Sequence, residues 1–409
     1  MNRIILIGNG FDLAHNIETS YTQFLNSYWS NTIENIFKSN GDLYFDNEQL
    51  RIDNCPRGVG LDFDYHKLKQ HVHQYRGSMI FKNTFLEHIS EKQNLKTWVD
   101  IEEEYYKLLK DTIQDVQRGE LSSLISLNKN FKEIQLLLEE YLDDQVKKKK
   151  LNNNHLYYLG DRIYSKIEYD DLSEIGKTEY VKRKKGKYLS EISKNKTINS
   201  DDKDKLNRLD RNLGQINEKD FLKEDRLIKH LDFSPENVLF LNFNYTSTCR
   251  LYLKDYVPHD LSENFIGSKV INIHGSIKKE YNPIIFGYGD ELDDDYKIIE
   301  KINENKLLDN IKSIKYLETA NYKSLLQFIE SDIYQVFVMG HSCGTSDRTL
   351  LNSLFEHDNC QSIKFFYHKK ENGDDNYSDV IRNISRNFNN KVVMRDKVVN
   401  KKYCKSLID

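Results

Sequence analysis

Two stretches of this sequence end an apolar run in side chains suited to acid–base chemistry. The stretch FLNFNYTST contains Asn242, Asn244 and Thr246, and the stretch INIHGS contains His274. Histidine is the side chain best suited to act as a general base near neutral pH. An asparagine at the end of a strand is well placed to orient a water molecule or a sugar hydroxyl. The structural alternative is that the asparagines bond their own backbone in a turn and that the histidine only packs.

The opening stretch RIILIGNGFD, residues 3–12, ends an apolar run in two glycines and a carboxylate. Gly8 and Gly10 predict a turn whose backbone N–H groups approach a phosphate, helped by the positive end of the following helix. The third glycine of a dinucleotide-binding fingerprint is absent. Asp12 would repel a pyrophosphate, but it can accept from a ribose hydroxyl or cap the helix. The alternative is a tight strand-to-helix turn that binds nothing.

The stretch MGHSCGTSD contains the pattern G-x-S-x-G at residues 340–344, with Ser342 as the candidate nucleophile of a serine hydrolase. That chemistry needs an acid and a histidine further along the chain. The downstream candidates are Asp347, Asp358, His357 and His368. Asp347 is too close to Ser342 for the usual arrangement, so we keep this reading as an alternative.

Two charged stretches allow other readings. Asp100 and Glu104 lie four residues apart and share a helix face, as a carboxylate metal site would require. A solvated acidic helix face with Trp98 in the core is the favoured interpretation. The basic run KRKKGK, residues 182–187, would suit a toxin that acts on nucleic acid, but a solvated charge run is the simpler explanation.

The elements that position these residues follow from the hydrophobic pattern. Short buried strands separated by helices predict an α/β fold with a mostly parallel, Rossmann-like sheet. Ligands of such sheets bind beyond the carboxyl ends of the strands. We therefore expect a first part of the nucleotide-binding domain at residues 1–80, a large helical insertion at 81–233, and the second part at 234–409. The expected strands are 3–8, 237–243, 269–275, 283–289, 334–340, 362–368 and 391–395, whereas residues 39–62 look loop-like.

The composition narrows the class of protein. The chain has 409 residues and a formal net charge of -4, which is unlike the basic footprint of a dedicated nucleic-acid binder. Its five cysteines contain no C-x-x-C pair, which argues against a disulfide scaffold and a thiolate zinc site. We expect no metal, no membrane span and a cytoplasmic location.

Taken together, these motifs resemble one family. The stretches IILIGNGFDLAHNIETSYTQFL, WVDIEEEY, FNYTST, INIHGS, IFGYGDE and GHSCGTSDR are similar to those of the AbiH family of bacterial abortive-infection (anti-phage) proteins. The resemblance covers both ends of the chain and leaves about 110–230 unaligned. It implies an anti-phage effector, and it leaves open a phage-derived trigger and a homo-oligomer.

The order of the motifs also resembles, more distantly, that of sirtuin-like NAD-consuming domains. That resemblance implies that Asn244 positions a water or ribose, that His274 is the base, and that NAD is the substrate. Thr246 stands where that family has Asp, and a four-cysteine zinc module is missing, so NAD⁺ hydrolysis fits better than deacylation. NAD and NADP are not distinguished, and a nucleotide-sensing module without turnover stays an alternative. The implied binding residues are Gly8, Asn9, Gly10, Phe11, Asp12, Tyr245, Gly275, Gly340, His341, Ser342 and Asp347.

Overall fold

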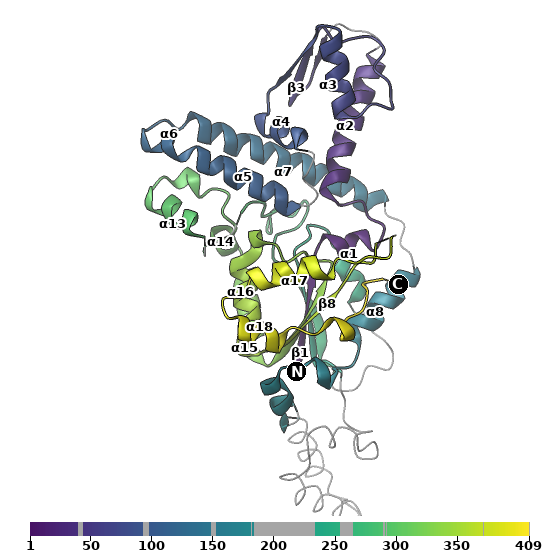
Figure 1. Ribbon diagram of the computed structural model, residues 1–409, viewed down its shortest axis with the longest axis vertical. Helices are drawn as coiled ribbons and strands as arrows, with labels where there is room; N and C mark the ends of the chain where they lie inside the picture. The colour runs from purple at the N-terminus through teal and green to yellow at the C-terminus, as the bar shows by residue number, and fades with distance from the viewer. Residues whose placement is uncertain are drawn as a thin grey trace, which may run out of the picture.

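The centre of the molecule is a five-stranded parallel sheet (Figure 1). The computed structural model describes residues 1–39, 44–92, 98–148, 153–180, 182–183, 234–253, 265–288, 291, 293–370 and 372–408. The strands stand in the order β6-β5-β1-β7-β8, and each neighbouring pair is parallel. Their bounds are β1 Asn2–Ile7, β5 Asn237–Asn242, β6 Gly267–Asn272, β7 Tyr334–Met339 and β8 Cys360–Phe366.

Strand β1 occupies the middle of this sheet because both of its faces are apolar. Ile4 and Leu6 pack in one core cluster with helices α15, α16 and α17, and Ile5 and Ile7 pack in another with helix α8. Numbered along the chain, the strands run 3-2-1-4-5 across the sheet, so the winding reverses beside β1. This confirms the predicted Rossmann-like α/β fold and leaves a crevice beyond the ends of β1 and β7. The helices are α8 Asn153–Tyr164, α15 Asn321–Ser331, α16 Arg348–Phe355, α17 Tyr377–Arg386 and α18 Lys391–Lys397.

A helical arm lies beyond the carboxyl ends of the strands (Figure 1). We use this name for α2 Tyr21–Lys38, α4 Thr84–Glu91, α5 Trp98–Asp111, α6 Ile113–Gln117 and α7 Ser122–Lys148. Helix α2 begins with a capping box, in which the Ser20 and Gln23 side chains each accept from the other residue's backbone N–H. The arm ends in a small antiparallel sheet with one helix, made of β2 Tyr44–Asp46, β3 Leu50–Asp53, β4 Ser78–Phe81 and α3 Tyr65–Gln74.

The arm makes two aromatic contacts with residues 284–288, which come after β6 in the chain. Phe131 of α7 stacks on Phe286 with ring centroids 4.7 Å apart, and Tyr106 of α5 stacks on Tyr288 at 4.1 Å. The Ile285 N–H donates to His274 O at 2.8 Å, so this segment connects the arm to the residues just after β6. Below the arm lie α13 Asp294–Lys301 and α14 Lys312–Lys315 (Figure 1). Several further helices are short: α1 Asn9–Leu13 and the 3-10 helices η1 Tyr169–Asp171, η2 Thr248–Tyr252, η4 Asn305–Leu307, η5 Tyr316–Glu318, η6 Thr345–Asp347 and η7 Lys401–Tyr403.

Several sequence predictions about elements are wrong. Residues 391–395 were expected to be a strand, but they begin helix α18, because the Asn390 side chain accepts from the N–H groups of Val392 and Val393. Residues 283–289 form no strand within their described part, in which Tyr288 makes a single bridge to Ile311. Residues 39–62, expected to be loop-like, contain β2 and β3.

Other predictions are met or lie outside the described residues. Strand β1 pairs with β5 on one side and β7 on the other, so the first and last predicted parts share one sheet. The division at 80 and 233 stays a prediction, and residues 184–233 lie outside the described ranges. All five cysteines are free and buried. Among the described helices, none combines the length and the apolar character that crossing a membrane requires.

The turn after β1 lies directly against the end of β7. The Gly8 N–H donates to Met339 O at 3.3 Å, and the Gly10 N–H donates to Gly340 O at 2.9 Å. A Cβ on Gly8 would stand 2.4 Å from His341 Cα. Gly340 has φ +76°, and a Cβ there would stand 2.1 Å from the backbone N of Phe11. The glycines therefore allow two backbone segments to touch.

Gly340→Ala should destabilise the protein far more than Gly119→Ala. Gly119 shares the left-handed backbone, with φ +83°, but an added Cβ meets nothing within 4 Å. The Gly119 variant is expected to lose roughly 1–2 kcal/mol for the backbone strain alone. The Gly340 variant, which adds a clash with the backbone, should lose more than about 3 kcal/mol or fail to fold. Thermal unfolding of both variants checks this, and equal losses would contradict the close approach.

Candidate functional site

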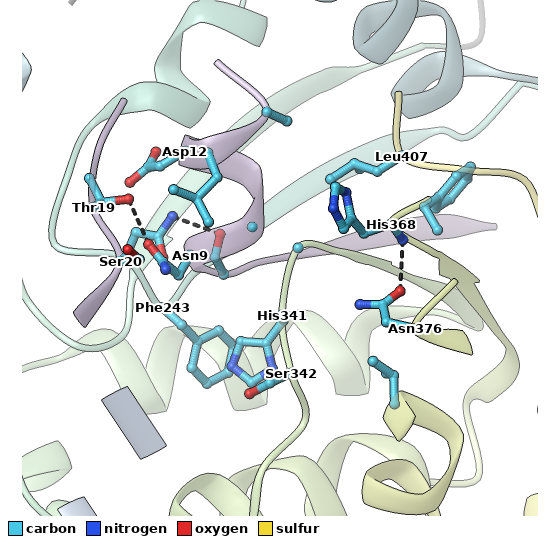
Figure 2. A pocket seen from close by; sticks show the side chains of 18 of the residues that line it. Asn9, Asp12, Thr19, Ser20, Phe243, His341, Ser342, His368, Asn376 and Leu407 are labelled. Carbon is cyan, nitrogen blue, oxygen red and sulfur yellow. Dashed lines mark hydrogen bonds between the residues drawn. The ribbon is translucent and has the colours of Figure 1, made fainter. Parts of the chain in front are cut away.

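A cavity of about 540 Å³ opens at the carboxyl ends of the strands. Its walls come from the turn after β1, from the segments after β5, β6 and β7, from α17, and from the C-terminal segment (Figure 2). The predicted site residues that line it are Gly8, Asn9, Gly10, Asp12, Asn244, Tyr245, His274, Gly340, His341, Ser342 and Asp347. The structure thus brings the ends of four strands to one cavity.

Two of the predicted binding residues do not line the cavity. Phe11 is fully buried and packs against His15 and Tyr252, with ring centroids 4.7 and 5.6 Å away. Gly275 has φ +83°, and an added Cβ would stand 1.9 Å from Pro283 O. Phe11 and Gly275 therefore belong to the packing around the cavity and not to its lining.

The glycine turn does not offer the phosphate cradle that its sequence predicted. The N–H groups of Gly8 and Gly10 already donate to the end of β7, and α1 is only five residues long. Asp12 does not cap that helix either. Its buried carboxylate accepts from Thr246 Oγ1 at 2.6 Å and so ties the turn to the segment after β5.

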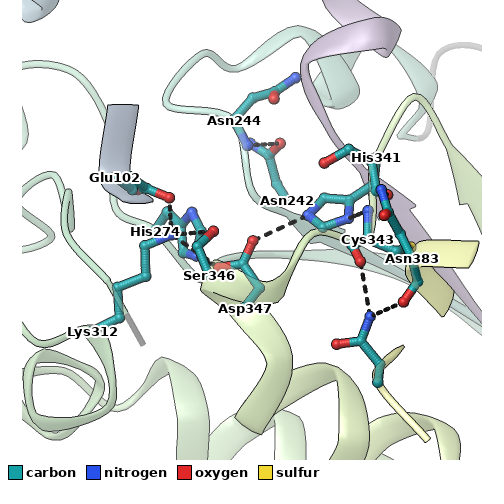
Figure 3. A network of polar contacts seen from close by, with 12 residues as sticks. Glu102, Asn242, Asn244, His274, Lys312, His341, Cys343, Ser346, Asp347 and Asn383 are labelled. Atoms are coloured by element: carbon teal, nitrogen blue, oxygen red, sulfur yellow. Dashed lines mark hydrogen bonds and ion pairs between the residues drawn. The ribbon is translucent and has the colours of Figure 1, made fainter. Parts of the chain in front are cut away.

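Asn244 presents an amide to the cavity from the end of β5 (Figure 3). Its backbone N–H donates to Asn242 Oδ1 at 3.1 Å, and its side-chain Nδ2 donates to Gly8 O at 2.9 Å. Asn242 is itself buried and held by Asn272 Oδ1 at 3.0 Å. Within the described ranges, the Asn244 Oδ1 atom accepts no hydrogen bond, so it can accept from a water or a ligand hydroxyl.

His274 is held by Asp347, and the contact fixes where its proton lies. The Nε2 atom stands 3.1 Å from Asp347 Oδ1 and 3.0 Å from the Tyr316 hydroxyl. Burial and the Lys312 ammonium lower the pKa of His274 to about 4, although Asp347 acts the other way. The ring is therefore neutral near pH 7. Because the carboxylate can only accept, the single proton lies on Nε2, and Nδ1 keeps its lone pair.

Asp347 is ionised because Lys312 lies beside it. Burial alone would raise the pKa of Asp347, but the Lys312 ammonium and His274 hold it well below its usual range. Lys312 Nζ stands 3.0 Å from Asp347 Oδ1 and 2.8 Å from Glu102 Oε2, and Ser346 Oγ lies 3.4 Å away (Figure 3). Lys312 is 1% exposed. Two carboxylates compensate this buried charge.

A second histidine faces Asp347 from the end of β7. His341 Nδ1 accepts from the Cys343 backbone N–H at 3.0 Å, which leaves Nε2, 3.6 Å from Asp347 Oδ2, for the ring proton of the neutral form. The His341 ring lies over Phe243, with centroids 4.2 Å apart. Asp347 is thus bordered by two histidines and one lysine.

Ser342 lacks the partners of a hydrolase nucleophile. In the described parts of the chain, no histidine hydrogen-bonds its hydroxyl, and the residue's backbone carbonyl accepts from Asn383 at 2.9 Å. The left-handed backbone falls on Gly340 and Cys343 rather than on the serine. His357, a predicted triad partner, contacts Glu330 instead. Ser342 does line the cavity together with Asp347 and His368, but none of its hydrogen bonds within the described ranges is one that the serine hydrolase requires.

The sequence did not reveal Glu102 and Lys312, the acid and the cation that lie next to the His274–Asp347 pair. Glu104 was expected on a solvated face but is 5% exposed, and Glu102 of the same helix is 3% exposed. Glu104 contacts His88 at 2.7 Å and Lys107 at 2.8 Å, which corrects both the solvated-face and the metal-site readings for this residue. Lys312 carried no motif at all. Only the apolar neighbours of Glu102 in the sequence IEEEYY hinted at burial.

The far end of the cavity was also missed. Phe366, Val380 and Leu407 give the cavity an apolar wall. Leu407 lies beside His368, whose backbone N–H donates to Asn376 Oδ1 at 2.7 Å (Figure 2). His368 had been named only as a possible triad partner, and the sequences of β8, α17 and the C-terminal segment predicted none of the other residues of this wall. The cavity therefore has a charged end at Asp347 and a more apolar end at Leu407.

Glu102→Gln should gain stability relative to the wild type as the pH rises. Burial, opposed by Lys312 and aided by Asp347, raises the pKa of Glu102 from 4.5 to about 7. The folded protein binds the proton more tightly, so wild-type stability falls between these two values by up to roughly 3 kcal/mol. Melting temperatures at about pH 5 and 8 should show the variant's relative gain at the higher pH. A gain that is constant or shrinks would contradict the raised pKa.

Comparison with known proteins places this chain in a family. A model of the family described as "Bacteriophage abortive infection AbiH" matches residues 4–369. Neither the comparison with curated proteins nor that with solved structures found a match, so the resemblance to sirtuin-like domains stays a prediction. The family match spans both the sheet and the arm. The chain belongs to the AbiH family of bacteriophage abortive-infection proteins.

Proposed function

We propose that this protein stops phage growth by hydrolysing the bond between nicotinamide and ribose in NAD⁺. The observation that carries the proposal is the His274 ring, whose Nε2 lies 3.1 Å from Asp347 Oδ1, in the same cavity as the Asn244 amide. The cavity lies at the ends of β1 and β7, where sheets of this topology bind nucleotides. Its volume lies within the range of small-molecule sites.

The reaction needs a base and a sited water. Hydrolysis breaks the bond from ribose C1 to the nicotinamide nitrogen, forms a bond from C1 to the water oxygen, and releases one proton. Asn244 Oδ1 orients the water or a ribose hydroxyl, and His274 Nδ1 accepts the proton. Asp347 then stabilises the imidazolium, because a carboxylate lies 3.1 Å from Nε2.

The charge of the cavity also supports breaking this bond. The ribose gains positive charge as nicotinamide leaves, and carboxylates at this end favour that charge. Asp347 and Glu102 meet at this end, where Lys312 contacts both of them, and Asp12 is a third carboxylate that lines the same cavity. We therefore place the nicotinamide ribose at this end and the phosphates of NAD⁺ away from it.

His274→Ala and Asn244→Ala should each lower the rate of nicotinamide release. Loss of a general base typically costs about 10²–10⁴-fold, and loss of the orienting amide should cost a similar order. His73→Ala, on the exposed face of α3, serves as the control and should keep full activity. The measurement is free nicotinamide from purified protein and NAD⁺. Binding of NAD⁺ without release would identify a sensing module, and full activity in His274→Ala would reject the assigned base.

The charged end should also distinguish NAD⁺ from NADH. The nicotinamide ring of NAD⁺ is a cation and that of NADH is neutral, so carboxylates at this end favour the oxidised form. We expect roughly tenfold tighter binding of NAD⁺, which corresponds to about 1.4 kcal/mol. Calorimetric titration of His274→Ala, which should consume NAD⁺ about 10²–10⁴-fold more slowly than the wild type, compares the two forms. Equal affinities would place the nicotinamide ring elsewhere.

A further inference from the structure

The helical arm reaches the reaction centre through one buried carboxylate. Glu102 belongs to α5, Lys312 to α14 and Asp347 to η6, and the Lys312 ammonium joins the two carboxylates at 2.8 and 3.0 Å. The three side chains are between 1% and 5% exposed. Figure 3 shows Glu102 and Lys312 on the same side of Asp347 as His274, with His341 on the other side.

Further contacts fix α5 against the segments around the site. The Glu102 Oε1 atom accepts from the Gly287 N–H at 3.4 Å, and Thr345 Oγ1 donates to Glu103 at 3.0 Å. Farther along α5, Lys110 contacts Asp295 at 2.7 Å. A shift of the arm would therefore move Glu102 relative to Lys312.

We propose that Glu102 is a positioning residue for the Asp347–His274 pair and that it acts through Lys312. The position of the helical arm relative to the sheet therefore sets the catalytic activity of this pair. The inference rests on the proposed function of His274 and goes beyond it. With Glu102 in place, the ammonium is shared between two carboxylates, and Asp347 can keep its contact with His274. Without that charge, the ammonium is attracted to Asp347 alone and competes with the histidine for it.

Removing the charge of Glu102 alone changes the electrostatic field at His274 differently from removing the charges of Glu102 and Lys312 together. The groups facing this ring are Asp347 of η6, Lys312 of α14, Tyr316 of η5, Tyr245 after β5 and His341 after β7. Glu102→Gln leaves the lysine less compensated. The double change Glu102→Gln with Lys312→Met removes the competing cation, keeps the summed charge, and leaves Asp347 to the histidine.

The test is the pH profile of nicotinamide release for the wild type, Glu102→Gln, the double variant and Glu103→Gln. Glu103 is the matched control, because it lies on the same helix and also contacts η6. Because Glu102 is charged only above about pH 7, we expect Glu102→Gln to lower kcat by about 10–100-fold above that pH, with little change in KM, and to match the wild type below it. Glu103→Gln should stay near the wild type. The double variant should regain activity above about pH 7, where the contacts with His274 and His341 still lower the pKa of Asp347. It should lose activity on acidification at a higher pH than the wild type, because the lysine no longer lowers the pKa of His274.

The outcomes separate this inference from the proposed function. Equal losses in Glu102→Gln and Glu103→Gln, or a double variant no better than the single one, would overturn the positioning role. Phage plating on cells that express each variant measures protection by the same site and assumes no particular substrate. If the wild type protects cells but releases no nicotinamide, the NAD⁺ proposal fails, and the order of protection among the variants decides the role of Glu102.

Discussion

The ammonium group of Lys312 lies between two buried carboxylates, and the state of His274 depends on this shared ion pair. A buried lysine needs compensating charge, and Asp347 and Glu102 supply it from two different parts of the fold. Because the lysine keeps Asp347 ionised, the carboxylate can hold His274 by Nε2 alone. Burial lowers the pKa of His274 and the same ammonium lowers it further, so one cation acts on both members of the pair.

The sheet topology explains why these residues meet. Strand β1 is the first strand of the chain and the middle strand of the sheet, so the segments after β5, β6 and β7 converge beside its end. Gly8 and Gly340 let the turn after β1 touch the end of β7, which is why these glycines are needed even though they bind no phosphate through the N–H groups expected to do so. On the side of the arm, Glu102 of α5 lines the cavity.

The sequence predicted the sheet and much of the cavity, because apolar strands that end in polar or glycine residues leave a local pattern. His274, Asn244 and Asp347 stand at or just beyond such ends, and the structure places all three on one cavity. The pattern failed where a side chain decides the outcome, as at Asn390, whose cap makes a helix of a strand-like stretch. Lys312 and Glu102 were out of reach, because their meeting depends on how α5 packs on the sheet and not on any local spacing.

The central claim is that His274 is a neutral base with its lone pair on Nδ1. Nitrogen NMR of histidine-labelled protein tests it most directly, with the His274 signals assigned from their loss in a His274→Asn variant. At about pH 7 the account predicts a protonated Nε2 and an unprotonated Nδ1, with no change on acidification until about pH 4 to 5. A proton on Nδ1, or on both nitrogens, at neutral pH would contradict it.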